Sequence, residues 1–368
     1  MADQPIYIPV DMLQNFMVDV LAGVGVPRSE AETAAEVLIS SDLRGVESHG
    51  VGRLKMYYDR IRAGTVKPAS EFEIVRESPA TALVDGHYGL GHVIARRAMQ
   101  MAIDKARICG MGSVAVRNST HFGIDGYYPL MAVAAGMAGM SFTNARPSIA
   151  PTYGVKPMLG TNPIAFGAPT DEECPFLYDA ATSITQRGKI EVAERAEKPV
   201  PEGWVIDQQG GFVTEPTEIL HGFDQGINAL LPLGGAGETL GGHKGYGLAT
   251  MVEIFSASFQ TGAFLYGTSG FDSQGNKTPL GVGHFFMAIN IEAFVPLDEF
   301  KATTGAILRE LRASTKAPGQ TRIYTAGEKE LENEKRVRIQ GVATNRNLQK
   351  EIKAMQAGLN LEQYHFPF

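Results

Sequence analysis

The stretch "ATALVDGHYGLGHVIARRAMQMAIDKARICGMGSVAVRNS", residues 80–119, decides the fold class. It has a short run of strand-forming residues at each end, and between them apolar residues recur at helical spacing over residues 91–108. The chain then repeats the alternation with "GYYPLMAVAAG", residues 126–136, and "GMSFTN", residues 139–144. Strands that alternate with helices predict an α/β domain. Further strands are expected at 163–169, 174–180 and 284–294, with a helix at 245–261.

The N-terminal part is predicted to be helical. Residues 11–22 carry apolar side chains at helical spacing and are followed by glycines. A second helix begins with a capping box formed by Ser29 and Glu32, in which each side chain satisfies a backbone N–H of the other residue. A third helix has Ser48 as its N-cap.

The C-terminal part returns to helix. An amphipathic pattern starts at Pro296, and the charged segment "GEKELENEKRVR", residues 327–338, is expected on the surface. The chain has 368 residues, more than the ~250–300 that one hydrophobic core usually supports. We therefore expect a helical unit of residues 1–78 plus about 300–368, and an α/β unit of residues 79–299.

Composition excludes several classes of protein. The net charge is −7 and the basic residues are scattered, which argues against a nucleic-acid partner. Cys109 and Cys174 lie far apart without CxxC spacing, so we expect no disulfide framework, no structural zinc and a reducing cytoplasm. The first residues lack the pattern of a secretory signal, and the apolar run at 130–140 is too short for a membrane span. A cytoplasmic protein is expected.

The first candidate site is "GVESHGVGRL", residues 45–54. A helix start favours anions, so a carboxylate can bind beside Ser48 and His49, with Arg53 one turn further on to grip it. The same positive end lowers the pKa of a histidine and keeps it ready to accept a proton. The alternative is a solvated histidine and an ordinary surface arginine.

The second candidate is His121 in "RNSTHFGIDGYY", residues 117–128. It follows a predicted strand, where α/β proteins gather ligand-binding groups. A loop histidine bonded to nearby backbone is an equally good interpretation of this segment.

The third candidate is "LPLGGAGETLGGHKGYGLA", residues 231–249. Its glycines allow close approach of a ligand, Lys244 adds a charge suited to phosphate, and a helix start follows. The spacing matches neither GxxxxGK[ST] nor GxGxxG, so a dinucleotide bound here would not use the usual Rossmann loop. A flexible surface loop is the alternative.

The fourth candidate combines "LGTNPIAFGAP", residues 159–169, with "YDAATSITQRGKIE", residues 178–191. These segments carry short polar side chains beside predicted strands, and such groups hydrogen-bond ribose or pyrophosphate. They also form turns, which is their commoner role. The side chains are Thr161, Asn162, Thr182 and Ser183.

Six motifs in order along the chain resemble the type-2 malate/L-lactate dehydrogenase family. They are "RGVESHGVGRL", "RNSTHFG", "LGTNPIAFGAP", "DAATS", "PEGWVIDQQG" and "GGHKGYGLA". The resemblance extends to about residue 330. The residues of the first and last motifs are most similar to those of the malate dehydrogenase members. The family also contains sulfolactate, ureidoglycolate, diketogulonate and cyclic imino acid oxidoreductases.

The resemblance implies a non-Rossmann α/β domain that binds NAD, with NADP possible, and helical segments from both chain ends packed together. It implies a homodimer with its active site near the subunit boundary. The implied reaction is hydride transfer between the cofactor and a small 2-hydroxy acid, with L-malate to oxaloacetate preferred. The alternative substrates are another 2-keto acid or a cyclic 2-imino acid.

The resemblance also implies roles for individual residues. His49 carries the proton in some members and His121 in others, Ser48 and Arg53 bind substrate, and Asp207 orients His49. No metal is implied. Cofactor contacts carry over onto Asn144, Arg146, Thr161, Asn162, Asp179, Thr182, Ser183, His243, Lys244 and Gly327, although "YTAGEKE" around Gly327 departs from the family's wording.

Two other classes compete with this interpretation. A metal hydrolase would use some of the eight histidines, but the chain has no HExxH or comparable paired spacing. A binding module without catalytic activity would not change nicotinamide fluorescence, whereas a dehydrogenase would.

Overall fold

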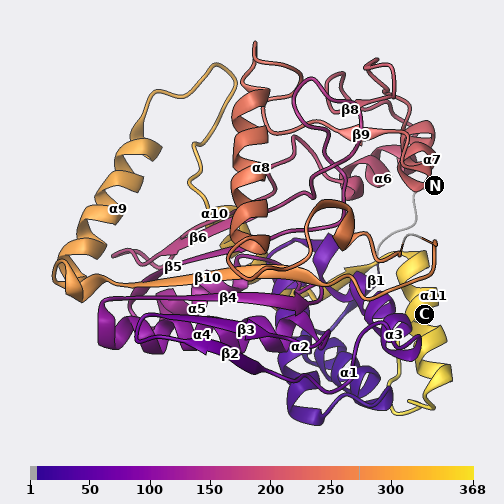
Figure 1. The fold of residues 1–368 in the computed structure, drawn as a ribbon, viewed down its shortest axis with the longest axis horizontal. Coiled ribbons are helices and arrows are strands. Elements are labelled where there is room, and N and C mark those ends of the chain that lie inside the picture. Colours follow the sequence, from indigo (N-terminus) through magenta and orange to yellow (C-terminus); the bar gives the residue numbers. More distant parts are fainter. Residues whose placement is uncertain (1–5, 273) are drawn as a thin grey trace.

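The computed structural model describes residues 6–272 and 274–368 and is built on a seven-stranded mixed sheet (Figure 1). The strand order is β2-β3-β4-β10-β5-β6-β7. The strands are β2 (Glu73–Glu77), β3 (Thr81–Asp85), β4 (Met111–Ser119), β5 (Met137–Thr143), β6 (Ile164–Ala168), β7 (Phe176–Ala180) and β10 (Val282–Asn290).

Within this sheet, β3 and β4 pair in parallel and every other neighbouring pair is antiparallel. The parallel pair is joined by the crossover helix α4 (Gly91–Cys109), as a parallel connection requires. The predicted α/β alternation at residues 80–144 is confirmed, and so are the later strands. The predicted helix at 245–261 exists as α8 (Gly242–Ala257), which begins three residues earlier.

Helices cover both faces of the sheet (Figure 1). On one face α4 and α5 (Tyr127–Ala134) bury a cluster of small and aromatic side chains that includes Tyr128 and Phe286. On the other face α8 packs against β10 and β5, with Phe142 and Phe285 in the contact. The strands of the sheet centre are therefore covered on both sides, and their ends carry the candidate site residues.

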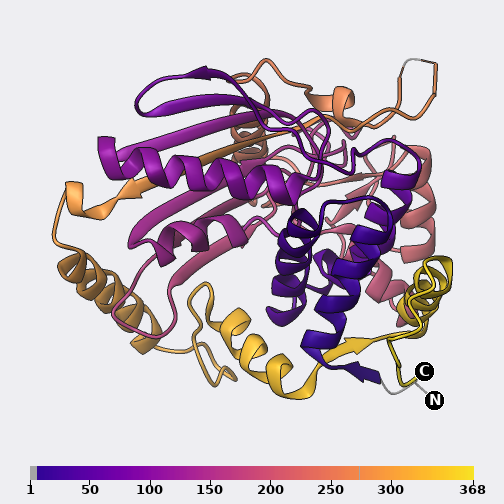
Figure 2. The ribbon, with the colours of Figure 1, turned by 90° about the horizontal axis from the view of Figure 1, so that it is seen from below.

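Both ends of the chain contribute to one helical cluster (Figure 2). Buried residues of α1 (Val10–Gly23), α2 (Arg28–Leu43) and α3 (Leu54–Arg62) pack with residues of α10 (Glu328–Gln340) and α11 (Arg346–Gly358). The short strands β1 (Ile6–Ile8) and β11 (Val342–Thr344) pair antiparallel beside them.

The expected unit boundaries stay a prediction. Strand β2 belongs to the sheet although it lies inside the range 1–78 that was expected to be helical, and residues 1–5 of that range lie outside the described residues. Helix α9 (Leu297–Ala313) confirms the amphipathic segment expected after Pro296, and in Figure 1 it stands away from the helical cluster.

A separate hydrophobic cluster packs against α8 and is formed by short helices and strands. They are α6 (Arg187–Arg195), β8 (Val205–Ile206), α7 (Pro216–Gln225) and β9 (Ala229–Leu230). The 3-10 helices η3 (Leu265–Thr268) and η4 (Ile291–Ala293) complete the described elements together with η1 and η2, which belong to the site. None of the described helices combines the length and the apolar character needed to cross a bilayer.

Two predicted helix starts are wrong. Helix α2 begins after Pro27 and has no side-chain cap, because proline's fixed φ already suits a helix entry and Glu32 instead approaches Arg28 at 3.5 Å. Ser48 is not the N-cap of α3 either. It lies in a 3-10 turn, and α3 begins only at Leu54.

Candidate active site

The segment that carries His49 forms two successive 3-10 turns, η1 (Glu47–His49) and η2 (Val51–Arg53), instead of a helix start. The buried carboxyl of Asp42, on α2, holds these turns by accepting the Val51 N–H at 2.8 Å. Gly50 passes directly over this carboxyl, and a Cβ there would lie 2.0 Å from Asp42 Oδ1. Burial raises the pKa of Asp42 to about 8, with Glu47 adding to the effect. The glycine of the SHG motif is therefore required by packing.

His49 is bound within its own turn. Its Nδ1 lies 2.8 Å from Ser48 Oγ, and Arg53 Nε donates to the Ser48 carbonyl at 2.6 Å. Burial lowers the pKa of His49 to about 4, and the charge of Arg53 adds to the shift. The expected neutral imidazole is present, but burial and a neighbouring arginine produce it in place of the expected helix-start charge.

His121 stacks on His49, with 5.4 Å between ring centroids and 23° between ring planes. The turn after β4 presents it, and burial lowers its pKa well below the usual value, with His49 as the next cause. The two predicted histidines, 72 positions apart in the sequence as numbered, thus belong to one site. This stacking is not expected of a fully solvated His49, and His121 also has the backbone contact with Gly123 that its alternative interpretation predicted.

Tyr57, on α3, fixes the orientation of His121. Its hydroxyl lies 2.5 Å from His121 Nδ1, and the Gly123 N–H points at the same nitrogen at 3.4 Å. Because the backbone N–H can only donate, we assign Nδ1 as the acceptor, and the neutral ring then carries its proton on Nε2. Tyr57 was not among the residues that the sequence predicted for the site, and this contact was missed.

Further aromatic side chains pack against Tyr57 and against the turn that carries His121. The fully buried His92 lies edge-on to the Tyr57 ring, with centroids 4.7 Å apart. Burial lowers the pKa of His92 to about 3, so it is neutral and acts as a packing group. His284, on β10, stacks on Phe122 at 4.4 Å, and its Nδ1 lies 2.8 Å from Thr143 Oγ1. These rings hold the turn after β4 against the sheet.

Two arginines, Arg53 and Arg60, act electrostatically on the histidine pair, and Arg146 acts on Arg60. Arg53, Arg60 and Arg146 form no ion pair within the part of the chain that the structure describes. Arg60 is half-buried, and burial together with the charges of Arg146 and Arg53 lowers its pKa. A site of this kind attracts anions.

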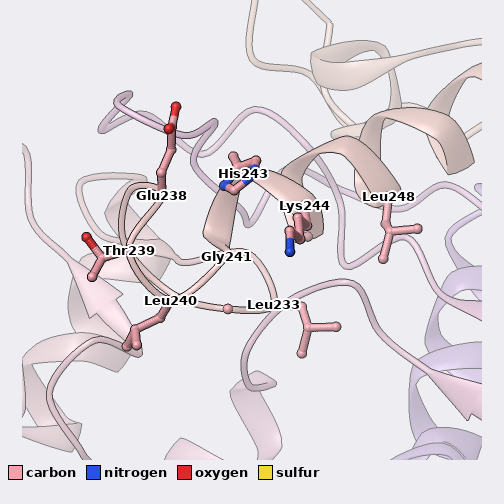
Figure 3. Close-up of a pocket in the computed structure, with 10 residues that line it drawn as sticks. Leu233, Glu238, Thr239, Leu240, Gly241, His243, Lys244 and Leu248 are labelled. Carbon is pink, nitrogen blue, oxygen red and sulfur yellow. The ribbon is translucent and has the colours of Figure 1, made fainter.

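The glycine-rich loop forms a separate open cavity of about 450 Å³ at the start of α8 (Figure 3). Figure 3 shows His243 and Lys244 on the first turn of this helix, with Glu238 across the loop. The loop folds tightly on itself: a Cβ on Gly242 would lie 1.9 Å from the Gly235 carbonyl oxygen, and one on Gly245 would lie 2.1 Å from that of Leu233. This packing explains the glycines and leaves two basic groups at a helix N-terminus.

A comparison with known proteins decides the family. The model of the family described as malate/L-lactate dehydrogenase matches residues 8–353. This chain belongs to the malate/L-lactate dehydrogenase family. The chain is 45% identical to malate dehydrogenase of Pyrococcus horikoshii over 97% of its own length and 96% of the relative's. It is 39% identical to L-sulfolactate dehydrogenase of Methanocaldococcus jannaschii over 95% and 97%.

Solved structures agree. The crystal structure of malate dehydrogenase from Entamoeba histolytica superposes with a TM-score of 0.95 at 42% identity and covers 99% of this chain and 100% of its own. The resemblance stated from the six motifs is thereby confirmed. Membership of the malate/L-lactate dehydrogenase family makes the chain an oxidoreductase that acts on a small 2-hydroxy acid.

The side chains of Asn144 and Asn162, which the family resemblance assigns to the cofactor, are bonded inside the protein. Asn144 is 2% exposed and Asn162 is 0% exposed. Their Nδ2 groups donate to the buried carboxylate of Glu253, at 3.3 and 2.7 Å, and their oxygens accept the N–H groups of Gly283 and Ala145. These bonds anchor the end of β5 and the start of β6 to α8, and the implied cofactor contacts of both residues stay a prediction.

The hydroxyls of Thr182 and Ser183 are also used internally. Thr182 Oγ1 donates to the carbonyl of Asn162 at 3.0 Å, and Ser183 Oγ donates to that of Thr185 at 2.6 Å. Both residues are buried, which fits the turn-forming interpretation of their hydroxyls, and the expected ribose or pyrophosphate contacts stay a prediction.

The other implied residues lie in different places. Asp179 accepts the Gly126 N–H at 2.7 Å at the end of β7, and the backbone of Thr161 accepts from Thr182. Gly327 has φ +98° and caps α10 beside β7. Asp207 accepts the N–H groups of two residues of its own turn, at 2.8 Å each, and no described hydrogen bond or ion pair joins it to His49. The orienting role expected for Asp207 stays a prediction, and the side chain that contacts His49 in this structure is Ser48.

Proposed function

We propose that the protein oxidises L-malate to oxaloacetate, with NAD as the preferred cofactor and NADP as the alternative. The observation that carries this proposal is the stacked pair of neutral histidines beside unpaired arginines. The relative of 45% identity and the structure of TM-score 0.95, both malate dehydrogenases by name, support malate over other 2-hydroxy acids.

The substrate is held through its carboxylate. Arg53 is exposed toward solvent on η2, and its Nε bond to the Ser48 carbonyl leaves the outer guanidinium nitrogens for a ligand. A carboxylate bound there brings the hydroxyl-bearing carbon beside the histidine pair. Bidentate binding also fixes the orientation of that carbon, which matters more for rate than for affinity.

His49 accepts the hydroxyl proton in this proposal. If its Nδ1–H donates to Ser48 Oγ, its Nε2 has a free lone pair, and its low pKa keeps the ring unprotonated near neutral pH. His121 has the opposite arrangement, because Tyr57 and Gly123 occupy its Nδ1 and leave Nε2–H as a donor. His121 then donates a hydrogen bond to the same substrate oxygen.

The nicotinamide cofactor supplies the hydride acceptor when bound. The residues at the start of α8 fit a phosphate-bearing group, because Lys244 and His243 are basic, exposed and next to the positive end of a 16-residue helix. We assign Lys244 to the cofactor phosphate. Relatives in the family are named for NAD and for NADP, and the sheet order with one parallel pair supports a non-Rossmann mode of binding.

The assembly is proposed to be a cytoplasmic homodimer. The outer side of α8 exposes several apolar side chains near the cofactor cavity, which suits burial against a second copy close to the active site. These side chains are Leu248, Met251 and Ile254.

The deciding experiment is a substrate screen with purified protein. L-malate, L-lactate, L-sulfolactate and ureidoglycolate are each incubated with NAD and with NADP, and the reduced nicotinamide is followed by absorbance. We expect the highest kcat/KM with L-malate. Faster turnover of L-sulfolactate would make that acid, and not L-malate, the preferred substrate. No turnover of any 2-hydroxy acid with either cofactor would contradict the proposal.

A further inference from the structure

One face of α3 carries three groups directed at the active site. Arg53, at the N-cap of the helix, Tyr57 and Arg60 are separated by four and three positions, which places them on the same side. The contact of Tyr57 with His121 shows which way this side faces. The mechanism above uses Arg53 and Tyr57 and leaves Arg60 without a role.

The surroundings of Arg60 favour an anion. Its guanidinium is half-buried, has no carboxylate partner in the described ranges 6–272 and 274–368, and lies close enough to Arg146 and Arg53 for their charges to act on it. Two other arginines have carboxylate partners: Arg117 pairs with Asp85 at 2.8 Å, and Arg312 pairs with Glu172 at 2.6 Å. Like charges gathered in a partly desolvated place are unfavourable until a negative group joins them.

Arg60 lies about one turn beyond Tyr57 on the active-site side of α3. Arg53 and Arg60 are seven positions apart, roughly 10 Å along the helix axis at 1.5 Å per residue. Helical side chains lean toward the N-terminus of their helix, so the long side chain of Arg60 leans back over the turn that carries Tyr57, whose hydroxyl contacts His121. The charge of Arg60 therefore lies on the histidine side of the helix, separate from that of Arg53, and is available to a second anionic group.

We propose that Arg60 is a specificity-determining residue that binds a second anionic group at the far end of the substrate. The site then selects 2-hydroxy acids that carry a carboxylate or a sulfonate on the carbon next to the hydroxyl-bearing one, and it disfavours those that end in a methyl group. This inference rests on the proposed function for the position of the first carboxylate at Arg53. Arg146 adds positive charge beside Arg60.

The test compares the ratio of kcat/KM for L-malate to that for L-lactate in the wild type and in Arg60→Gln. Loss of a hydrogen bond to a charged group predicts that this ratio falls roughly 10- to 100-fold, mainly through the KM for malate. The matched control is Arg62→Gln on the same helix, because Arg62 is exposed and bonds the Tyr58 hydroxyl, and there the ratio stays as in the wild type. An unchanged ratio in Arg60→Gln would overturn the inference while leaving the malate assignment intact.

A binding measurement keeps the inference testable even if the enzyme turns over neither acid. Succinate has two carboxylates and no hydroxyl, and butyrate has one carboxylate on a chain of the same length. Succinate should raise the melting temperature of the wild type more than butyrate does, and Arg60→Gln should remove that difference. Equal effects of the two acids on the wild type would show that no second anion is bound, independently of the reaction.

Discussion

Replacing Asp42 by asparagine should stabilise the protein at neutral pH. The carboxyl of Asp42 is 4% exposed and lies against the backbone of Gly50. Its hydrogen bond from the Val51 N–H is retained by the asparagine oxygen, so the turns that carry His49 keep their anchor. The substitution therefore removes a buried ionisable group without removing a hydrogen-bond acceptor.

The magnitude follows from the pKa of Asp42, which is raised from 3.8 to about 8 by burial and by Glu47 on η1. A raised carboxyl pKa means that the folded state binds the proton more tightly than the unfolded state. Stability is then greatest below pH 3.8 and is lost as the pH rises toward 8, by about 1.4 kcal/mol per pH unit at most. At pH 7 the cost of Asp42 is thus on the order of 4 kcal/mol, which Asp42→Asn relieves.

Urea unfolding at several values between pH 5 and pH 8 measures this effect. The wild type should lose unfolding free energy with rising pH relative to Asp42→Asn, and the gap should widen across the range. Asp59→Asn is the control, because Asp59 is exposed on α3 and pairs with Lys55 at the surface. A constant gap between wild type and Asp42→Asn would refute the account of a buried, protonated carboxyl.

Two further predictions concern the reaction. His49→Ala should lower kcat by ~10²- to 10⁴-fold while cofactor binding, followed by nicotinamide fluorescence, is unchanged; if only His121→Ala loses kcat, the two histidines exchange roles. Lys244→Ala should weaken cofactor affinity several-fold, and added salt should weaken the wild type in the same direction because the contact is between charges; a loss confined to substrate affinity would assign the glycine-rich loop to the other ligand.

The sequence predicted the sheet better than the turns between its elements. The runs at 80–119 and 139–144 became β3, α4, β4 and β5 because their apolar periodicity reflects burial on a sheet or a helix face. The antiparallel entry of β10 between β4 and β5 was not predictable, since it joins segments more than 130 residues apart. Ser48 resembled an N-cap by residue type alone, and the Asp42–Val51 bond, which sets the real turn, leaves no local signal.

The proposed catalytic residues were found by motif, and their supporting residues were not. His49, His121 and Arg53 lie in short segments whose residue types suit proton transfer and carboxylate binding. Tyr57 has the helical spacing of a buried residue, and only the approach of α3 to the turn after β4 shows that its hydroxyl meets His121. A residue that acts through another side chain is therefore visible only once distant segments are placed together.

The asparagines next to the strands have internal partners that the sequence did not predict. Short polar side chains at strand ends are suited to hydrogen bonds with a nucleotide. The β-ladder gives these side chains no hydrogen-bond partner, however, so they need partners elsewhere in the protein. In this chain Glu253 of α8 provides them, because its carboxylate accepts from Asn144, Asn162 and the Leu265 N–H. The carboxylate ties the end of β5 and the start of β6 to the helix whose first turn carries Lys244. These polar residues thus fix the position of α8, which carries the proposed phosphate-binding residue Lys244, relative to the sheet. The proposed affinity for the cofactor phosphate then comes from groups that remain exposed, such as Lys244.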